Sequence, residues 1–288
     1  MLELLQSNAP VAIALAGILG LFIGSFLNVV ILRLPPLMEY GWRTQSREVL
    51  ELPADPAPPP PGIALSRSRC PKCDYQLGAL ENIPLLSYLL LRGKCSNCAA
   101  PISLQYPAVE LLTGVLSAVV VWKLGATIPG LAALLMTWLL IAMSGVDART
   151  KLLPDGLTLS LLWIGLLLSL VPVFIEPRQA IIGAACGYGV LWIVFQVFKL
   201  VTGKDGMGFG DFKLLAALGA WLGATQLPLV ILLSSLVGAV VGGAWLALKR
   251  NGHSEPIPFG PFLAASGWIA LLWGKDIINA YLRFSNLG

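Results

Sequence analysis

Charged side chains are scarce in this sequence. Only 12% of its 288 residues are charged, 57% are hydrophobic, and the mean hydropathy is +0.80. Soluble domains average about 25% charged residues, so the composition excludes an ordinary soluble protein. The net charge of +4 is too small to indicate a nucleic-acid partner. The single histidine, His253, excludes a metal site made of several histidines.

Long apolar runs make up most of the chain. Because a helix needs about 20 apolar residues to cross a bilayer, we predict an all-α polytopic membrane protein with about eight transmembrane helices. No basic residue precedes the first run, which favours a retained helix over a cleaved signal peptide. The expected spans are 10–32, 108–124, 129–146, 157–175, 179–200, 212–225, 227–248 and 260–274.

One polar stretch interrupts the apolar runs. Residues 33–106 hold eight Lys or Arg, six Asp or Glu and a proline-rich spacer at 53–61. We therefore expect three parts: a first transmembrane helix at 1–32, a loop domain at 33–106 and a seven-helix membrane domain at 107–288.

The basic residues predict how the protein is oriented. With eight spans, 15 of the 19 Lys and Arg residues fall on one side of the membrane, in segments 33–106, 147–156, 199–213 and 249–250. Loops rich in Lys and Arg stay in the cytoplasm. The loop domain is thus expected in the cytoplasm and both termini in the periplasm.

Four of the five cysteines form two C-x2-C pairs with 21 residues between them. The pairs are Cys70 with Cys73 and Cys95 with Cys98. Two such turns can complete a tetrahedral zinc site, which would be closed and structural because four thiolates leave no open position. Two disulfides are the alternative, but they seldom persist in the reducing cytoplasm. We predict a zinc-ribbon-like site that holds one ion.

Two aspartates border apolar spans on the predicted cytoplasmic side. Asp147 follows one span, and Asp211 ends a stretch with alternating Gly206, Gly208 and Gly210. Two neighbouring carboxylates can act as acid and base to activate water, as in aspartic proteases, and the glycines could let an extended peptide approach. The alternative is that each aspartate merely caps a helix as an N-cap or first-turn residue, the role we expect for Asp155.

Helix dipoles suggest roles for the two carboxylates. Asp211 would stand at a helix N-terminus, which favours its charged form, and Asp147 at a C-terminus, which does not. We therefore expect Asp211 to be the base and Asp147 its protonated partner, although Arg149 and Lys151 oppose this order.

The sequence resembles the type IV prepilin leader peptidases, which also N-methylate their product. The motifs that carry the resemblance are GSFLNVV at 24–30, RLP at 33–35, RCPKC at 69–73, ENIPLLSY at 81–88, RGKC at 92–95, YPAVE at 106–110, DARTKLLPD at 147–155, GFGD at 208–211 and PIPFGP at 256–261. They keep the family's order and spacing over nearly the whole chain.

The resemblance implies a GxGD-type aspartyl protease of the bacterial inner membrane with Asp147 and Asp211 as its catalytic pair. Its substrates would be prepilins and the pseudopilins of type II secretion, cut on the cytoplasmic side after a glycine. The new N-terminal residue, usually phenylalanine, would be methylated with S-adenosylmethionine. Gly93 and Lys94 match the methyl-transfer determinants, although they could instead form only a turn beside the second cysteine pair. The sequence has no glycine-rich Rossmann turn to bind that cofactor.

Glu110 enters a span, where a charge is costly, and its role stays open. A secondary transporter that relays protons through Asp147 and Asp211 is the main alternative function. A zinc-ribbon scaffold without catalysis is a third, but it gives the aspartates no role. The oligomeric state cannot be predicted.

Overall fold

The computed structural model describes residues 8–64, 67–78, 80–248 and 257–285. Within them the regular secondary structure is helical, apart from two isolated β-bridges in the loop that carries the cysteines. It forms two compact units, Met1–Ala126 and Thr127–Gly288. Lys249, Arg250 and Pro256, which entered the sequence predictions, lie outside the described residues, as do both termini.

The first unit is a pair of long helices joined by the loop. Helix α2 (Ala9–Val49) packs along α4 (Gln105–Leu124), and the loop between them contains η1 (Leu80–Asn82) and α3 (Leu86–Leu90). Glycines set the approach of the helices: a Cβ at Gly20 would stand 2.6 Å from the Ser117 hydroxyl, and one at Gly24 would stand 2.7 Å from Cα of Glu110. Small residues allow such close contact between membrane helices.

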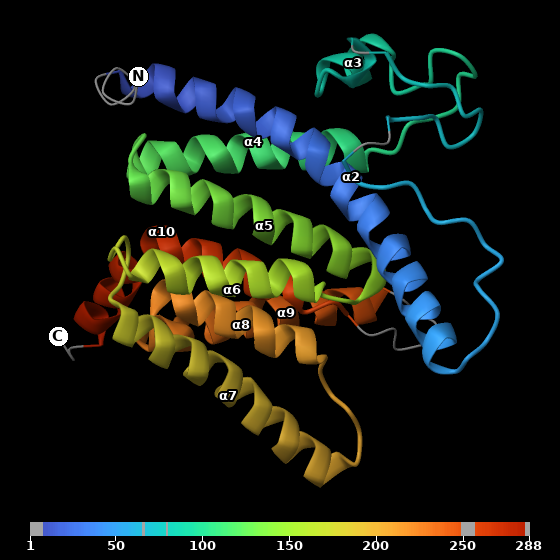
Figure 1. Cartoon of the computed structure of the whole chain (residues 1–288). Helices are drawn as coiled ribbons and strands as arrows, with labels where there is room; N and C mark the ends of the chain where they lie inside the picture. Colours follow the sequence, from blue (N-terminus) through green and yellow to red (C-terminus); the bar gives the residue numbers. More distant parts are fainter. Residues whose placement is uncertain (1–7, 65–66, 79, 249–256, 286–288) are drawn as a thin grey trace. The chain divides into compact units, whose positions relative to one another are not determined.

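Helix α2 continues well beyond the end that we predicted at residue 32. It runs to Val49 and includes Pro35 and Pro36. A proline inside a helix removes one backbone hydrogen bond and bends the helix, but does not have to end it. Figure 1 shows α2 change direction along its length. The polar part that we expected to begin at residue 33 therefore starts as helix.

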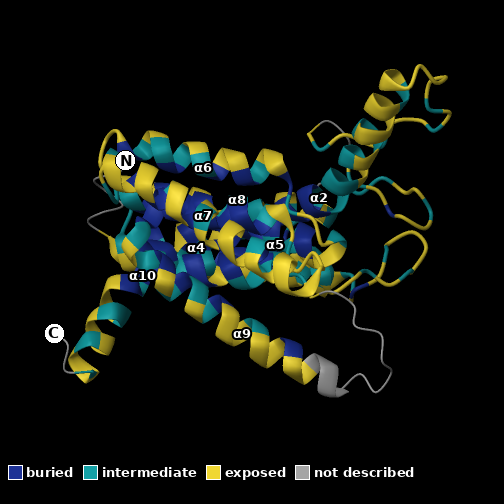
Figure 2. Ribbon diagram, turned by 90° about the horizontal axis from the view of Figure 1, so that it is seen from below, coloured by how far each residue is buried: buried dark blue, intermediate teal, exposed yellow. Residues whose placement is uncertain are grey.

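The second unit is a bundle of six helices. Their bounds are α5 (Ile128–Thr150), α6 (Asp155–Ser169), α7 (Pro177–Thr202), α8 (Phe209–Leu222), α9 (Leu227–Leu248) and α10 (Gly260–Phe284), with η2 (Ala224–Gln226) before α9. Helix α8 contacts α6, α7, α9 and α10. Every residue from Asp211 to Leu222 except Lys213 is buried, as the dark blue of α8 in Figure 2 shows.

Glycine contacts explain how a helix of 14 residues lies inside the bundle. Gly183 of α7 faces Gly219 of α8 so closely that a Cβ on either would collide with the other's carbonyl, and Gly187 faces the Leu215 carbonyl in the same way. Because protein surrounds α8, it does not need the length of a helix exposed to lipid. The segment with Gly219 therefore packs against other helices rather than facing lipid along its length.

Five of the described helices are long and apolar enough to cross a membrane. They are α2, α4, α5, α7 and the segment Ala224–Ala244 that includes most of α9, while α6 is a shorter apolar helix. Each predicted span coincides with a helix, although the bounds differ; α6, for example, ends at Ser169 rather than 175. The protein is a multi-pass, all-helical membrane protein.

Candidate active site and metal centre

Asp147 lies in the last turn of α5 and is only 4% exposed. Its Oδ2 accepts a hydrogen bond of 3.0 Å from the backbone N–H of Gly260, the first residue of α10. The first N–H groups of a helix have no partner within it, so a carboxylate placed there satisfies one of them. The side chain of Asp147 thus joins the end of α5 to the start of α10.

Asp211 lies in the first turn of α8 and is 8% exposed. Its backbone N–H donates to the carbonyl of Gly208, the extended residue before α8, and its carboxylate lies close enough to Asp147 for the two to interact electrostatically. The structure therefore brings the two candidate aspartates together. Asp211 lies at the start of α8, and Asp147 lies at the end of α5, where it contacts the start of α10.

This arrangement changes the helix-dipole argument. From the sequence we expected Asp147 to lie only at the C-terminus of its own helix. The contact with Gly260 places it at the N-terminus of α10 as well. Since both aspartates lie at helix N-termini, helix dipoles do not distinguish the base from the acid. Asp211 as the base stays a prediction.

Gly260 is a part of this site that we missed in the sequence. A Cβ at position 260 would stand 2.6 Å from Oδ2 of Asp147 and 3.1 Å from the Leu153 side chain. Its signal was its place in the PIPFGP motif directly before an apolar run, but nothing in the sequence paired it with Asp147. The absence of a side chain at 260 is what lets the carboxylate reach the backbone.

If Asp147 is catalytic, as the family resemblance implies, replacing Gly260 with alanine is expected to slow peptide cleavage by about 10²-fold, because moving a catalytic group by about 1 Å costs that much. The added methyl group must push away the Asp147 carboxylate. Gly189→Ala is the matched control, since a Cβ at Gly189 in α7 meets nothing within 4 Å. Initial cleavage rates of the purified variants check this, and equal rates for both would contradict the proposed fit.

The alternating glycines differ from our expectation. A Cβ at Gly206 would stand 2.6 Å from the ring of Phe198, and one at Gly210 would stand 2.8 Å from Cβ of Leu153. Both glycines therefore serve close packing within the protein. Only Gly208 has open space, with Oδ2 of Asp211 as its nearest neighbour at 4.0 Å. A peptide could approach at Gly208, but not along the whole stretch.

Asp155 lies in the first turn of α6, as predicted, although it is not the N-cap residue itself. The N-cap of α6 is Pro154, and Asp155 is the first residue of the helix. Its carboxylate instead pairs with Nζ of Lys213 at 2.6 Å. This pair ties the start of α6 to the start of α8, two residues after Asp211.

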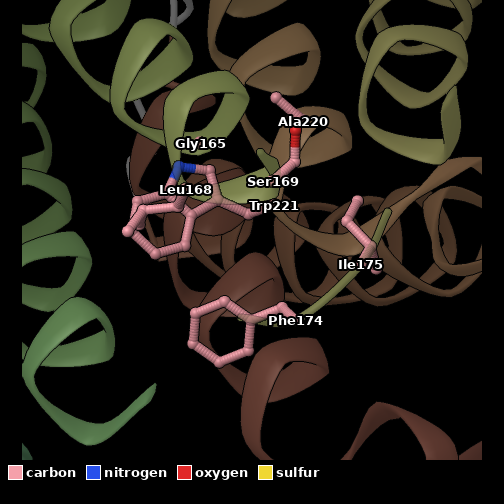
Figure 3. A pocket seen from close by; sticks show the side chains of 7 residues that line it. All are labelled: Gly165, Leu168, Ser169, Phe174, Ile175, Ala220 and Trp221. Carbon is pink, nitrogen blue, oxygen red and sulfur yellow. The ribbon is translucent and has the colours of Figure 1, made fainter. Parts of the chain in front are cut away.

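A small apolar hollow, shown in Figure 3, lies between the C-terminal ends of α6 and α8. Asp211 lies at the other end of α8. The hollow is lined by Gly165, Leu168, Ser169, Phe174, Ile175, Ala220 and Trp221. Its polar side chains already have partners: Ser169 donates to the Leu166 carbonyl and Trp221 to the Leu161 carbonyl. The hollow therefore offers no group for catalysis.

The four loop cysteines converge. Their sulfur atoms all lie within 4.8 Å of one another, with 3.8 Å between Cys70 and Cys98 and 4.0 Å between Cys73 and Cys95. Thiolates on a tetrahedral zinc ion, each about 2.3 Å from the metal, would be ~3.8 Å apart. None of the four forms a disulfide. The donor set and its spacing fit a tetrahedral metal site.

The two cysteine turns have the same backbone construction. In the first, the Cys70 N–H donates to the Tyr75 carbonyl, and Asp74, which has a positive φ, donates its N–H to the Cys70 carbonyl. Cys95, Ala99 and Ala100 repeat this pattern in the second. Backbone hydrogen bonds from Lys72 and Cys73 lower the pKa of Cys70 to about 6. The thiolate is the form that binds metals, so the turn prepares Cys70 as a ligand.

Gly93 and Lys94 lie at the start of the second cysteine turn. Gly93 has φ +68°, and a Cβ there would stand 2.9 Å from the Tyr88 hydroxyl. Its N–H donates to the Tyr88 carbonyl, and its carbonyl accepts from Ile102. Lys94 forms a β-bridge with Pro101 and its side chain is exposed. Gly93 thus shapes the turn, while Lys94 presents a cation to solvent.

Comparison with known proteins covers nearly the whole chain. Residues 18–124 match the bacterial peptidase A24 N-terminal domain, and residues 134–243 match the type IV leader peptidase family. A prepilin leader peptidase/N-methyltransferase of Stutzerimonas stutzeri is 54% identical over 285 residues, covering 99% of each chain. Proteins with the same name from Pseudomonas aeruginosa and Neisseria gonorrhoeae are 52% and 47% identical, covering 99% and 94% of this chain and 98% and 94% of their own. No solved structure matches the chain.

The four-cysteine loop falls within the first matched region, and Asp147 and Asp211 fall within the second. Both the identity and the coverage exceed what a shared fold alone would require. The chain belongs to the prepilin leader peptidase/N-methyltransferase family.

Proposed function

We propose that this protein removes the leader peptide from type IV prepilins and type II secretion pseudopilins, with Asp147 and Asp211 as its catalytic pair. The observation that carries the proposal is the convergence of these two buried carboxylates at the ends of α5 and α8. Buried charges at membrane depth are costly, and a pair of them is retained where chemistry needs it.

The proposed cleavage uses one ionised and one protonated aspartate. The ionised carboxylate takes a proton from a water molecule, whose oxygen attacks the carbonyl carbon of the scissile peptide bond. The protonated carboxyl group gives its proton to the carbonyl oxygen, which forms a neutral tetrahedral diol. When the diol collapses, the C–N bond breaks and the leaving nitrogen takes up the proton first removed from water. One diol hydroxyl gives its proton back to the other carboxylate, so that an acid and an amine form and both aspartates regain their starting protonation. The open backbone at Gly208 beside Asp211 is where the substrate strand would approach.

The eight helices and the basic loops support an orientation for this reaction. If each of the eight predicted spans crosses the bilayer, both aspartates and the cysteine loop face the cytoplasm. We propose that cleavage occurs at the cytoplasmic edge of the inner membrane. The substrate's own apolar segment would lie in the bilayer, beside the helices of this protein.

The cysteine loop would serve the second activity, N-methylation of the new terminal residue. Bound S-adenosylmethionine would supply the methyl group, and the exposed ammonium of Lys94 could bind a carboxylate of the cofactor or the substrate. One zinc ion on Cys70, Cys73, Cys95 and Cys98 would stabilise the loop. Zinc would take no part in cleavage, because four thiolates leave no position for water.

The products of one reaction test both activities. Purified protein in proteoliposomes is incubated with a prepilin, with and without S-adenosylmethionine, and intact masses are recorded. We expect leader removal under both conditions and the added mass of one methyl group only with the cofactor. A prepilin that stays uncleaved under both conditions would contradict the proposed function.

Lys94→Ala is expected to reduce methylation by about 10-fold or more through the lost charge contact, which corresponds to the ~1.5–3 kcal/mol of a charged hydrogen bond. Cleavage should stay within about twofold of wild type, because the aspartates belong to the other unit. Lys72→Ala, which removes an exposed lysine from the first cysteine turn, is the control. If Lys94→Ala and Lys72→Ala methylate the product equally well, Lys94 has no specific role in methylation.

The proton transporter is the less favoured function. Transporters of that type place acids near the membrane midplane on broken helices, whereas Asp147 and Asp211 lie at the ends of unbroken helices. The family relationship also gives no support to transport.

A further inference from the structure

Glu110 is a buried carboxylate that neither proposed activity uses. It is 7% exposed and lies in α4, where its Cα packs against Gly24 of α2. No cation pairs with it among the residues that the structure describes. Burying a carboxylate without a cation costs free energy unless hydrogen bonds compensate for the lost water, so its partners indicate what it does.

The partners of Glu110 come from two different elements. Its Oε2 accepts a hydrogen bond of 2.9 Å from the backbone N–H of Leu85 in the loop, and the carboxylate also accepts one from the Ser25 side chain of α2. One turn away, the Asn28 amide donates to the Tyr106 carbonyl across the same helix pair. Glu110 therefore fixes the part of the loop around Leu85 to α2 and α4, while Arg33 of α2 holds another part through the Gly62 and Arg67 carbonyls.

The backbone at Leu85 is strained. Its φ of 58° and ψ of −46° lie outside the regions that residues with side chains prefer, and Leu86 donates its N–H to the Pro84 carbonyl at 2.6 Å, which closes a γ-turn. Such turns with positive φ are rare, and their strain persists only where the surroundings enforce it. The N–H of Leu85 itself donates to the buried Glu110 carboxylate, a contact that holds the turn in place.

The turn leads directly to Gly93 and Lys94. It precedes α3, whose Tyr88 packs against Gly93 and accepts a hydrogen bond from its N–H. Glu81, before the turn, accepts hydrogen bonds from the Gly78 N–H and from the Ser96 hydroxyl of the second cysteine turn. Hydrogen bonds thus link residues 80–96 to one another, and Glu110 attaches them to the helices at Leu85.

We propose that Glu110 is a positioning residue for methyl transfer: its carboxylate holds the strained turn at Leu85 and so fixes the loop that carries Gly93 and Lys94 on the α2–α4 pair. The methyl-transfer role of that loop rests on the proposed function. The attachment itself does not. Glu110 acts here as a hydrogen-bond acceptor, and its charge is not needed.

Two substitutions separate acceptor from charge. Glu110→Gln keeps an oxygen that can accept from Leu85, and the Ser25 hydroxyl can turn to accept from the new amide. Glu110→Ala removes both bonds. We expect methylation to fall by about 10²-fold in the alanine variant, as for other misplaced reacting groups, and to stay within about threefold of wild type in the glutamine variant. Glu39→Ala, an exposed acid on α2, is the control.

Two further readouts distinguish positioning from general instability. Cleavage and zinc content should stay near wild type in both variants. Hydrogen exchange should speed up at residues 83–91 in Glu110→Ala but not in the cysteine turn at 95–101. This measurement requires no enzymatic activity, so it tests the attachment even if wild-type protein fails to methylate. The proposal would be overturned if Glu110→Ala methylated like wild type, if both variants lost methylation equally, or if hydrogen exchange at 83–91 did not change. Loss of cleavage together with loss of zinc would also overturn it.

Discussion

Replacing Cys95 with serine is expected to remove zinc from the protein, from one ion per chain to less than a tenth of that. Serine is a poor zinc ligand, and three thiolates leave the shell incomplete. Zinc binding by such sites supplies roughly 10–16 kcal/mol of folding free energy in small metal domains. Where the structure describes the loop, it contains only two short helices and two β-bridges, so little other structure keeps it folded.

The consequences should be confined to one activity. With its cysteine turns unfolded, the loop cannot hold Lys94 in place, and methylation should fall by more than about 10²-fold. Cleavage should continue, because the aspartates belong to the other compact unit. Elemental analysis of the purified protein, with both activities measured on the same sample, checks the prediction.

Cys186 provides the matched control. It is an exposed cysteine on α7. Cys186→Ser should keep one zinc ion per chain and both activities. Folded wild-type protein without zinc would contradict the metal assignment, and so would equal zinc loss in the two serine variants.

The features that sequence predicted well are local in the chain. A C-x2-C pair brings two thiolates onto one turn whatever surrounds it, so the cysteine cluster could be recognised from spacing alone. The helices follow from uninterrupted apolar runs. The two aspartates were visible because so few charged residues border those runs. The order and spacing of the motifs then related the chain to its family, and the comparisons confirmed that relationship.

The features that it did not predict depend on contacts between distant residues. Asp147 and Gly260 are 113 positions apart, and only the folded bundle shows that the start of α10 meets the end of α5. The same holds for Glu110 and Leu85, whose bond crosses 25 positions. Helix α2 extends beyond residue 32, where we predicted its end. We placed that end where the apolar residues stop, but the second half of α2 is polar and still helical. Composition indicates where lipid contact ends, not where a helix ends.

Removing either of the proposed catalytic aspartates, Asp147 or Asp211, should produce the largest functional loss. Asp147→Asn and Asp211→Asn preserve the size of the side chain, and the amide oxygen that the first substitution introduces can still accept from Gly260. What each variant loses is the ability to take up or release a proton. General acid–base catalysis contributes about 10²–10⁴-fold per group, so each variant should fall by at least that factor. The double variant should lose little more, because the two carboxylates act as one unit.

Asp205→Asn is the appropriate control for both variants. Asp205 lies in the segment just before the GxGD motif, and it pairs with Lys199 at 2.9 Å on the surface. Exposed ion pairs contribute at most about 1 kcal/mol, so this variant should fold and cleave like wild type. Thermal unfolding of all the variants shows whether a lost activity reflects a lost fold.

The central claim is that Asp147 and Asp211 together cut the leader peptide, and single-turnover cleavage of a prepilin tests it most directly. Wild type, Asp147→Asn, Asp211→Asn and Asp205→Asn are each used in excess over substrate in the same lipid, and the leader peptide is followed by mass. We predict cleavage by wild type and Asp205→Asn, and no cleavage above background by either of the other two. Cleavage that survives in a folded Asp147→Asn or Asp211→Asn protein would contradict the account.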